Sequence, residues 1–216
     1  YNISREQVTF SREFTKDLPV RIMELDYRDA VVPRNKESFD KIVSIGFWEH
    51  LGPKNYRTGM EIADFCLKQE GLFLLQTIGR HNKQGKRFDP WINHRIFPGG
   101  CLPFASEISE SSEGLFKLED VHNFGHYYAN TLNAWFKNFD SNWQEFNEQN
   151  RKELYEKLKI SFKDWPDFDL DKGERFYRMW KYYLSSCEGA FRSGSIDLYQ
   201  FVFSKGNPFT LYEPVM

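Results

Sequence analysis

Cysteine is scarce in this sequence of 216 residues. Cys66, Cys101 and Cys187 are widely spaced, odd in number and include no Cys-x-x-Cys pair. This pattern argues against a disulfide scaffold and against a zinc site, and it is typical of a reducing, cytoplasmic setting.

Signals for membranes, export and nucleic acid are also lacking. No apolar run approaches the roughly 18 residues that cross a bilayer, and no signal peptide is recognisable. The first residues, YNISREQ, are polar and carry no initiator Met, so we expect the sequence to be truncated at its start. A net charge of −2 creates no strong field for nucleic acid, and no nucleic-acid partner is expected.

Motifs of several enzyme classes are missing as well. The five histidines show no HExxH spacing and no GxSxG elbow occurs, which disfavours an ordinary hydrolase. Residues 167–174, DFDLDKGE, resemble a calcium loop, but Lys172 replaces the sixth-position Gly and Arg178 replaces the twelfth-position Glu. We therefore expect no metal site.

Aromatic residues, in contrast, are abundant at 18% of the chain. Phe, Tyr and Trp supply core area, and they also line pockets for long apolar ligands or cations. Composition alone leaves both uses open.

Apolar strand patterns alternate with helical patterns along most of the chain. Segment 72–79, LFLLQTIG, is apolar on both faces, as a central parallel strand should be. The order predicts an α/β fold, and the length fits a single domain over 1–216. The expected strands are 20–25, 41–46, 72–79, 116–124 and 196–206, and the expected helices are 4–16, 55–69, 104–114, 128–146 and 174–191.

Polar side chains follow several of these strands. Ligands of open α/β sheets lie outside the carboxyl ends of the strands, usually near a glycine-rich loop after the first strand. No such loop precedes 20–25, so either the fold needs none or the chain begins after it. The residues expected at the strand ends are Asp26, Glu49, Gln76, Tyr127 and Tyr128.

Such a group favours an enzyme with a nucleotide-like cofactor and an apolar substrate, although single residues keep plainer interpretations. Glu49 and His50 also suit a surface loop between strand and helix. Cys187, within a helical pattern, suits a buried inert thiol better than a nucleophile.

Five motifs carry a resemblance to a known family. They are FDKIVSIGFWEHLGPKNY, GLFLLQTIG, DPWINHRIFPGGCLP, HNFGHYYANTLNAW and YYLSSCEGAFRSGSIDLYQFVFSKG. In this order they resemble the cyclopropane-fatty-acyl-phospholipid synthases, which include the mycolic acid cyclopropane synthases. The resemblance implies a class I methyltransferase (Rossmann-like) fold with a mixed sheet and an antiparallel last strand. It also implies that the first strand and glycine-rich loop are missing, and that 80–174 holds substrate-side insertions and helices.

The resemblance further implies two small molecules, S-adenosylmethionine and a bicarbonate ion. The positions that match cofactor-binding residues are Asn2, Gln7, Asp26, Tyr27, Ile45 and Gly46. The positions that match bicarbonate ligands are Glu49, Gln76, the backbone of Ile78, and Tyr128, and Cys187 matches a cysteine often marked as catalytic. Gln76 departs from the family pattern, which has His there; Gln can donate a hydrogen bond but cannot be protonated.

The implied reaction begins when an acyl-chain double bond attacks the sulfonium methyl group and becomes a carbocation, after which loss of a proton closes the ring. The protein must then position the reactants, exclude water and stabilise a cation, a task that aromatic faces suit. The implied partner is an unsaturated phospholipid at the inner face of the membrane, where the basic loop 80–87 would meet anionic headgroups, and a homodimer is left open. Two alternatives remain: a related methyltransferase of a lipid or small amine that closes no ring, and an inactive fragment.

Overall fold

The computed structural model describes residues 1–81, 89–145, 153, 156, 174–206 and 212. Their contacts divide the chain into two compact units. The first unit comprises 1–80, 97–123 and 199–216, and the second comprises 81–96 and 124–198. Each unit is described by itself, and the assignment of 1–216 to a single domain stays a prediction.

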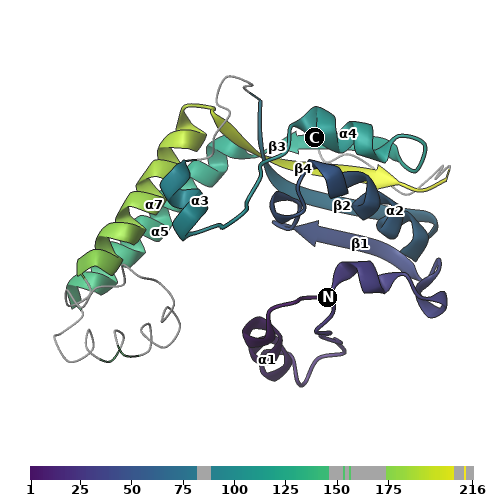
Figure 1. Ribbon diagram of the computed structural model, residues 1–216, viewed down its shortest axis with the longest axis horizontal. Coiled ribbons are helices and arrows are strands. Elements are labelled where there is room, and N and C mark those ends of the chain that lie inside the picture. The colour runs from purple at the N-terminus through teal and green to yellow at the C-terminus, as the bar shows by residue number, and fades with distance from the viewer. Residues whose placement is uncertain (82–88, 146–152, 154–155, 157–173, 207–211, 213–216) are drawn as a thin grey trace. The chain divides into compact units, whose positions relative to one another are not determined.

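A four-stranded sheet organises the first unit, with spatial order β1-β2-β4-β3 (Figure 1). The strands are β1 (Phe39–Ile45), β2 (Leu67–Arg80), β3 (Lys117–Asn123) and β4 (Ile196–Ser204). β1 and β2 are parallel, whereas β3 and β4 are antiparallel. The prediction of a mixed α/β sheet with an antiparallel last strand is therefore confirmed.

The core of this unit lies where the sheet meets two helices, α2 (Tyr56–Cys66) and α4 (Ala105–Ser112). Burial alternates along β2, so Phe73 and Leu75 are fully buried while Leu74 between them is only partly covered. Phe73 stacks on Phe203 of β4 with ring centres 5.9 Å apart. The helices predicted over 55–69 and 104–114 are confirmed, except that 67–69 belong to β2, which begins before the predicted strand 72–79.

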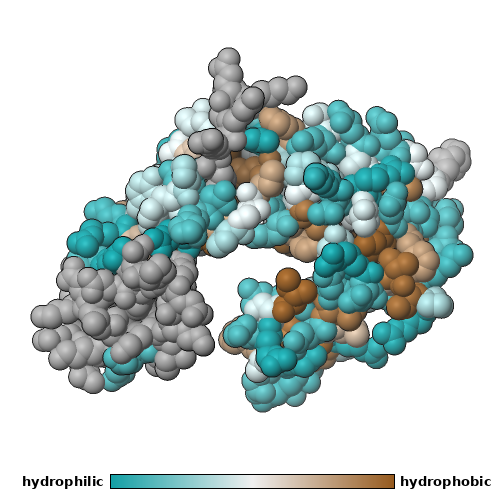
Figure 2. Space-filling view, in the orientation of Figure 1, coloured by the Kyte–Doolittle hydropathy of each residue, from teal (hydrophilic) through white to brown (hydrophobic). Residues whose placement is uncertain are grey.

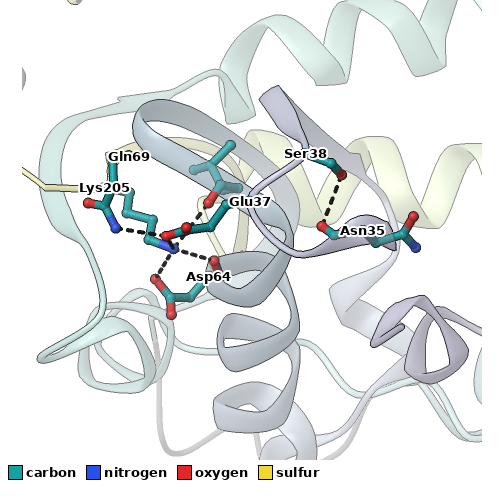
Figure 3. A network of polar contacts seen from close by, with 7 residues as sticks. Asn35, Glu37, Ser38, Asp64, Gln69 and Lys205 are labelled. Carbon is teal, nitrogen blue, oxygen red and sulfur yellow. Dashed lines mark hydrogen bonds and ion pairs between the residues drawn. The ribbon is translucent and has the colours of Figure 1, made fainter. Parts of the chain in front are cut away.

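A buried lysine fixes the end of β4 to the start of β2 (Figure 3). Lys205 is 8% exposed, and its Nζ donates to the backbone oxygens of Asp64 at 2.6 Å and Leu67 at 3.1 Å. The same ammonium lies 3.3 Å from the Asp64 carboxylate and 3.4 Å from that of Glu37. These bonds satisfy all three donors of the lysine, as burial requires.

Segment 20–25 was predicted as a strand, and this prediction is wrong. Its β pairing among the described residues is an isolated bridge between Glu24 and Asn2. Two backbone hydrogen bonds, from Asn2 to Met23 and from Leu25 to Asn2, make that bridge. A strand needs a ladder of such bonds along a neighbour, and apolar composition does not supply one.

The N-terminal helix α1 (Arg5–Phe14) confirms the prediction for 4–16. The Ser4 hydroxyl caps it by accepting from the amide of Gln7 at 3.4 Å. The Gln7 side chain does not reach back to the Ser4 amide as in a capping box, because Asn2 Nδ2 donates to it at 2.6 Å. Asn2 Oδ1 in turn accepts from the Ser4 amide at 2.8 Å, so Asn2 takes over that half of the cap.

The second unit is helical in its described part. The long helices α5 (Gly125–Glu145) and α7 (Glu174–Arg192) lie side by side (Figure 1) and confirm the predictions for 128–146 and 174–191. A short helix that the sequence did not predict, α3 (Pro90–Arg95), begins at Asp89, whose Oδ1 accepts from the amides of Trp91 and Ile92.

Two other sequence features fall mainly outside the described residues. They are the calcium-like aspartates of 167–171 and most of the basic loop 80–87. Within the described ranges, no group of His, Cys, Asp or Glu could hold a metal ion. Across those ranges, every helix is too short or too polar to cross a membrane.

Candidate active site

The carboxyl end of β1 turns sharply and carries Glu49 inward. Gly46 adopts φ +62°, a left-handed conformation that favours glycine, and its amide donates to the backbone oxygen of Gln76 at 3.1 Å. The next turn, η3 (Trp48–His50), is anchored by the buried Trp48 ring. As a result Glu49 is only 8% exposed, whereas His50 is exposed.

Glu49 makes one strong contact and leaves one oxygen unused. Its Oε1 accepts from the backbone amide of Ile78 at 2.7 Å, and its backbone oxygen accepts from the amide of Cys101 at 2.7 Å. Its Oε2 is buried and has no hydrogen-bond partner within the described part of the chain. Burial raises the pKa of Glu49, while the Ile78 amide opposes the rise. The site thus holds a carboxyl group that favours its protonated form and can donate or accept a proton at Oε2.

The sequence-predicted residues of β2 lie beside this carboxyl group. Gln76 is paired in register with Ile45, and Ile78 follows two residues later on the same face of the strand. The structure therefore joins Glu49 to the Ile78 amide and places Gln76 two residues earlier on the same face of β2. The Ile78 amide, expected to bind an anion, is occupied by Glu49.

These residues still fit a bicarbonate ion. A protonated Glu49 would donate from Oε2, and the half-buried Gln76 can donate from its amide. An ion that also used the Ile78 amide would have to share it with Glu49.

The predicted cofactor residues Asp26 and Tyr27 lie in the same unit. The Asp26 carboxylate accepts from the Arg28 backbone and guanidinium at 2.6 to 2.9 Å, and these bonds hold the pKa of Asp26 at about 2. The ring of Tyr27 meets that of Phe47 edge-on, with centres 5.0 Å apart.

Ile45 and Gly46 leave an open apolar surface next to that aromatic pair. The Ile45 side chain is 65% exposed, and a Cβ added at Gly46 would meet no atom within 4 Å. Figure 2 shows further apolar surface on this unit. These features fit the adenosyl part of a cofactor. Asn2 and Gln7 are hydrogen-bonded to each other, and the Asn2 bridge to Glu24 connects them with the segment that leads to Asp26.

Tyr128 and Cys187 belong to the second unit. The Tyr128 ring packs edge-on against Phe191 of α7 at 5.0 Å. Burial, with a contribution from Asp89, raises the pKa of Cys187 to about 11, so the thiol is protonated at neutral pH. Burial also raises the pKa of Tyr183, and Cys187 and Tyr128 add to the rise. The structure thus groups these side chains between α5 and α7, and the catalytic assignment of Cys187 stays a prediction.

Sequence reasoning missed a contact that holds α3 on α7. The Tyr182 hydroxyl donates to Asp89 Oδ2 at 2.8 Å, and the Tyr182 ring meets Trp91 edge-on at 5.0 Å. Asp89 and Pro90 are an N-cap and a proline at the first helical position, which together are typical of a helix start. The sequence did not predict a helix there, because several turn residues follow in the same segment.

The sequence is similar to a known protein family and to several characterised proteins. The model of the mycolic acid cyclopropane synthetase family matches residues 1–164. The chain is 44% identical over 204 residues to a cyclopropane-fatty-acyl-phospholipid synthase of Escherichia coli, covering 94% of this chain and 46% of the relative. It is 28% identical over 194 residues to a sphingolipid C9-methyltransferase of Komagataella phaffii, covering 86% of this chain and 35% of the relative. The chain thus spans about half the length, or less, of these curated relatives.

Solved structures show the fold. The cyclopropane synthase MmaA2 from Mycobacterium tuberculosis superposes with a TM-score of 0.69 at 24% identity, covering 94% of this chain and 68% of that chain. Coclaurine N-methyltransferase, bound to N-methylheliamine and SAH, gives 0.68 at 18% identity, covering 94% and 59%. The predicted class I methyltransferase fold is confirmed, and because the family model covers most of the sequence, the chain belongs to the mycolic acid cyclopropane synthetase family.

Proposed function

We propose that the complete protein transfers a methylene group from S-adenosylmethionine to the cis double bond of an unsaturated phospholipid acyl chain and forms a cyclopropane ring. The observation that carries the proposal is the buried Glu49 at the carboxyl ends of β1 and β2, which is held by the Ile78 amide and whose second oxygen has no partner among the described residues. The 44% identity to a cyclopropane-fatty-acyl-phospholipid synthase supports it.

S-adenosylmethionine is the proposed cofactor, and when bound it supplies the electrophilic methyl group. Tyr27 and the exposed Ile45 would cover its apolar adenosyl part beside the open backbone at Gly46. Asn2 and Gln7 would contact its ribose, after exchanging the hydrogen bond that now joins them.

The chain's own residues would control charge and protons near the reacting alkene. Glu49, Gln76, the Ile78 amide and Tyr128 are the proposed bicarbonate ligands, and that ion would supply the base for ring closure. Burial raises the pKa of Glu49, which favours the protonated form that would donate to an anion. Aromatic faces such as Phe47 would stabilise the cation by roughly 0.5 to 2 kcal/mol each.

The proposal is tested by incubating the complete protein with S-adenosylmethionine and vesicles of an unsaturated phospholipid. Mass spectrometry should show acyl chains heavier by one methylene without added unsaturation. Unchanged lipids from a folded, cofactor-binding protein would refute it. The Cys187→Ser variant should stay active, because the protonated thiol is not required.

Methyl transfer without ring closure is the second candidate function, and Gln76 favours it because a bicarbonate site without His would remove the proton less efficiently. The similarity to a sphingolipid C9-methyltransferase is compatible with it. In that case the wild type should form methyl-branched products, and Gln76→His should shift them towards rings. Rings as the main wild-type product would decide against it.

The proposed substrate also implies where the protein works. We expect peripheral binding to the cytoplasmic face of the membrane, measurable by co-sedimentation with vesicles. The homodimer remains a prediction that light scattering of the purified protein can check.

A further inference from the structure

Arg80 ends β2 two residues after Ile78 and is held in a defined position. Its amide donates to the backbone oxygen of Pro103 at 2.9 Å, and its backbone forms a bridge with Phe104. The guanidinium carbon lies 4.4 Å from the centre of the Phe104 ring. Strand, loop and ring together orient this side chain.

The Nε of this guanidinium is buried and has no hydrogen-bond partner within the described part of the chain. The acidic residue in the first turn of α4, Glu107, accepts instead from the amide of Phe104 at 2.8 Å. Partly buried arginines are normally paired, because an unpaired buried charge is costly. Stacking on a ring uses the face of the guanidinium and leaves its N–H edge for an oxyanion.

The position of Arg80 indicates which oxyanion. Gln76, Ile78 and Arg80 share one face of β2, since alternate residues of a strand point the same way. The Arg80 guanidinium therefore lies at the end of the strand that carries the proposed catalytic groups. A phospholipid brings one phosphodiester with two exposed oxygens, which suits bidentate binding by a guanidinium.

We propose that Arg80 binds the phosphodiester of the phospholipid substrate and thereby selects phosphate-bearing lipids. The inference rests on the proposed function, and it adds a headgroup contact to it.

The test compares two lipids that share their acyl chains. The complete protein and its Arg80→Leu variant are assayed with dioleoylphosphatidylglycerol vesicles and with vesicles of a dioleoyl glucosylglycerol, which lacks phosphate. Arg80→Leu should lower kcat/KM on the phospholipid about tenfold, mainly through KM, and leave the glucolipid rate nearly unchanged. Arg80→Lys should recover part of the loss, because it keeps the charge without the planar fork.

Arg34 is the matched control, since it is an exposed arginine that lies before the amino end of β1. Arg34→Leu removes the same charge and should leave both lipid rates unchanged. The melting temperature of Arg80→Leu should stay near that of the wild type because no ion pair among the described residues is lost. A large fall shared by Arg80→Lys would identify a structural residue and overturn the proposal.

Other outcomes would also overturn it. Equal losses on both lipids would exclude phosphate recognition. Arg80-dependent binding of inorganic phosphate below about 1 mM, with unchanged lipid kinetics, would identify a site for free phosphate instead. If the wild type forms no modified lipid, the proposed function fails, but preferential co-sedimentation with phosphatidylglycerol that Arg80→Leu abolishes would still support the headgroup contact.

Discussion

Glu49 has one carboxylate oxygen on the Ile78 amide and the other buried without a partner among the described residues. Burial raises its pKa above the ordinary value of 4.5, so the folded state favours the protonated carboxyl. Its contribution to stability is complete below the unfolded pKa and is lost as pH rises through the folded pKa.

This environment predicts how Glu49→Gln changes stability with pH. Gln keeps an oxygen for the Ile78 amide but cannot ionise, so it mimics the protonated carboxyl. The melting temperature of the variant should match the wild type near pH 4 and exceed it increasingly towards neutral pH. A difference that stays constant over this range would show that Glu49 is not held in a protonation-sensitive environment.

Gly79, near the end of β2, allows a close approach between neighbouring strands. A Cβ at this position would lie 2.8 Å from the ring of Tyr199 in β4 and 3.1 Å from the backbone oxygen of Pro103. Gly79→Ala should therefore lower the free energy of unfolding by about 1 to 3 kcal/mol, measured by chemical denaturation.

Gly189 provides the matched control for this substitution. It lies in helix α7, and an added Cβ would meet no atom within 4 Å. Gly189→Ala should stabilise the protein by roughly 0.5 to 1 kcal/mol, because Ala favours the helix. Equal effects of the two substitutions would contradict the packing argument.

At the scale of elements, the sequence predicted strands and helices where burial and periodicity agreed. The apolar runs of β1 and β2 predicted both strands, which pair with each other in a parallel ladder of backbone hydrogen bonds, although β1 lies at the sheet edge and is largely exposed. Segment 20–25 has a similar composition but pairs with a single residue, Asn2. Pairing partners are a property of the folded chain, so composition could not separate these cases.

For the candidate site, the sequence predicted which residues lie at the strand ends but not the contacts that they make. The expected order of strands and helices placed Glu49 and Gln76 at the carboxyl ends of strands. The family resemblance then assigned both residues as bicarbonate ligands. The sequence could not show that Glu49 takes the Ile78 amide for itself, because that contact depends on the buried turn after Gly46. It also could not show that Arg80 Nε is buried without a hydrogen-bond partner among the described residues, since such partners would come from distant segments.

The Lys205 contacts join elements far apart in the sequence, and Lys205→Met tests them (Figure 3). Met keeps the apolar stem but leaves the backbone oxygens of Asp64 and Leu67 without their donor. We expect a loss of about 1 to 3 kcal/mol in the free energy of unfolding.

Lys68→Met is the control, because the Lys68 to Asp40 ion pair is largely exposed. It should change the free energy of unfolding by less than about 1 kcal/mol. If both variants lose the same stability, the buried contacts of Lys205 contribute no more than a surface ion pair.

The division of the whole chain into two units is reflected in separate sets of buried residues. Phe203 is fully buried in the first unit, and Leu184 is 4% exposed in the second. Buried side chains stabilise mainly the cooperative unit in which they pack, and native-state hydrogen exchange reports each unit's opening.

Phe203→Leu, which should cost about 1 to 2 kcal/mol, is therefore expected to speed amide exchange in β1 and β2 more than in α5 and α7. Leu184→Ala should produce the reverse pattern, because it removes a contact from the helical unit. Exchange measured by mass spectrometry after proteolysis resolves these segments. If either substitution accelerates exchange evenly over all four elements, the chain opens as one cooperative body, and the single domain predicted for 1–216 describes its energetics better than two units do.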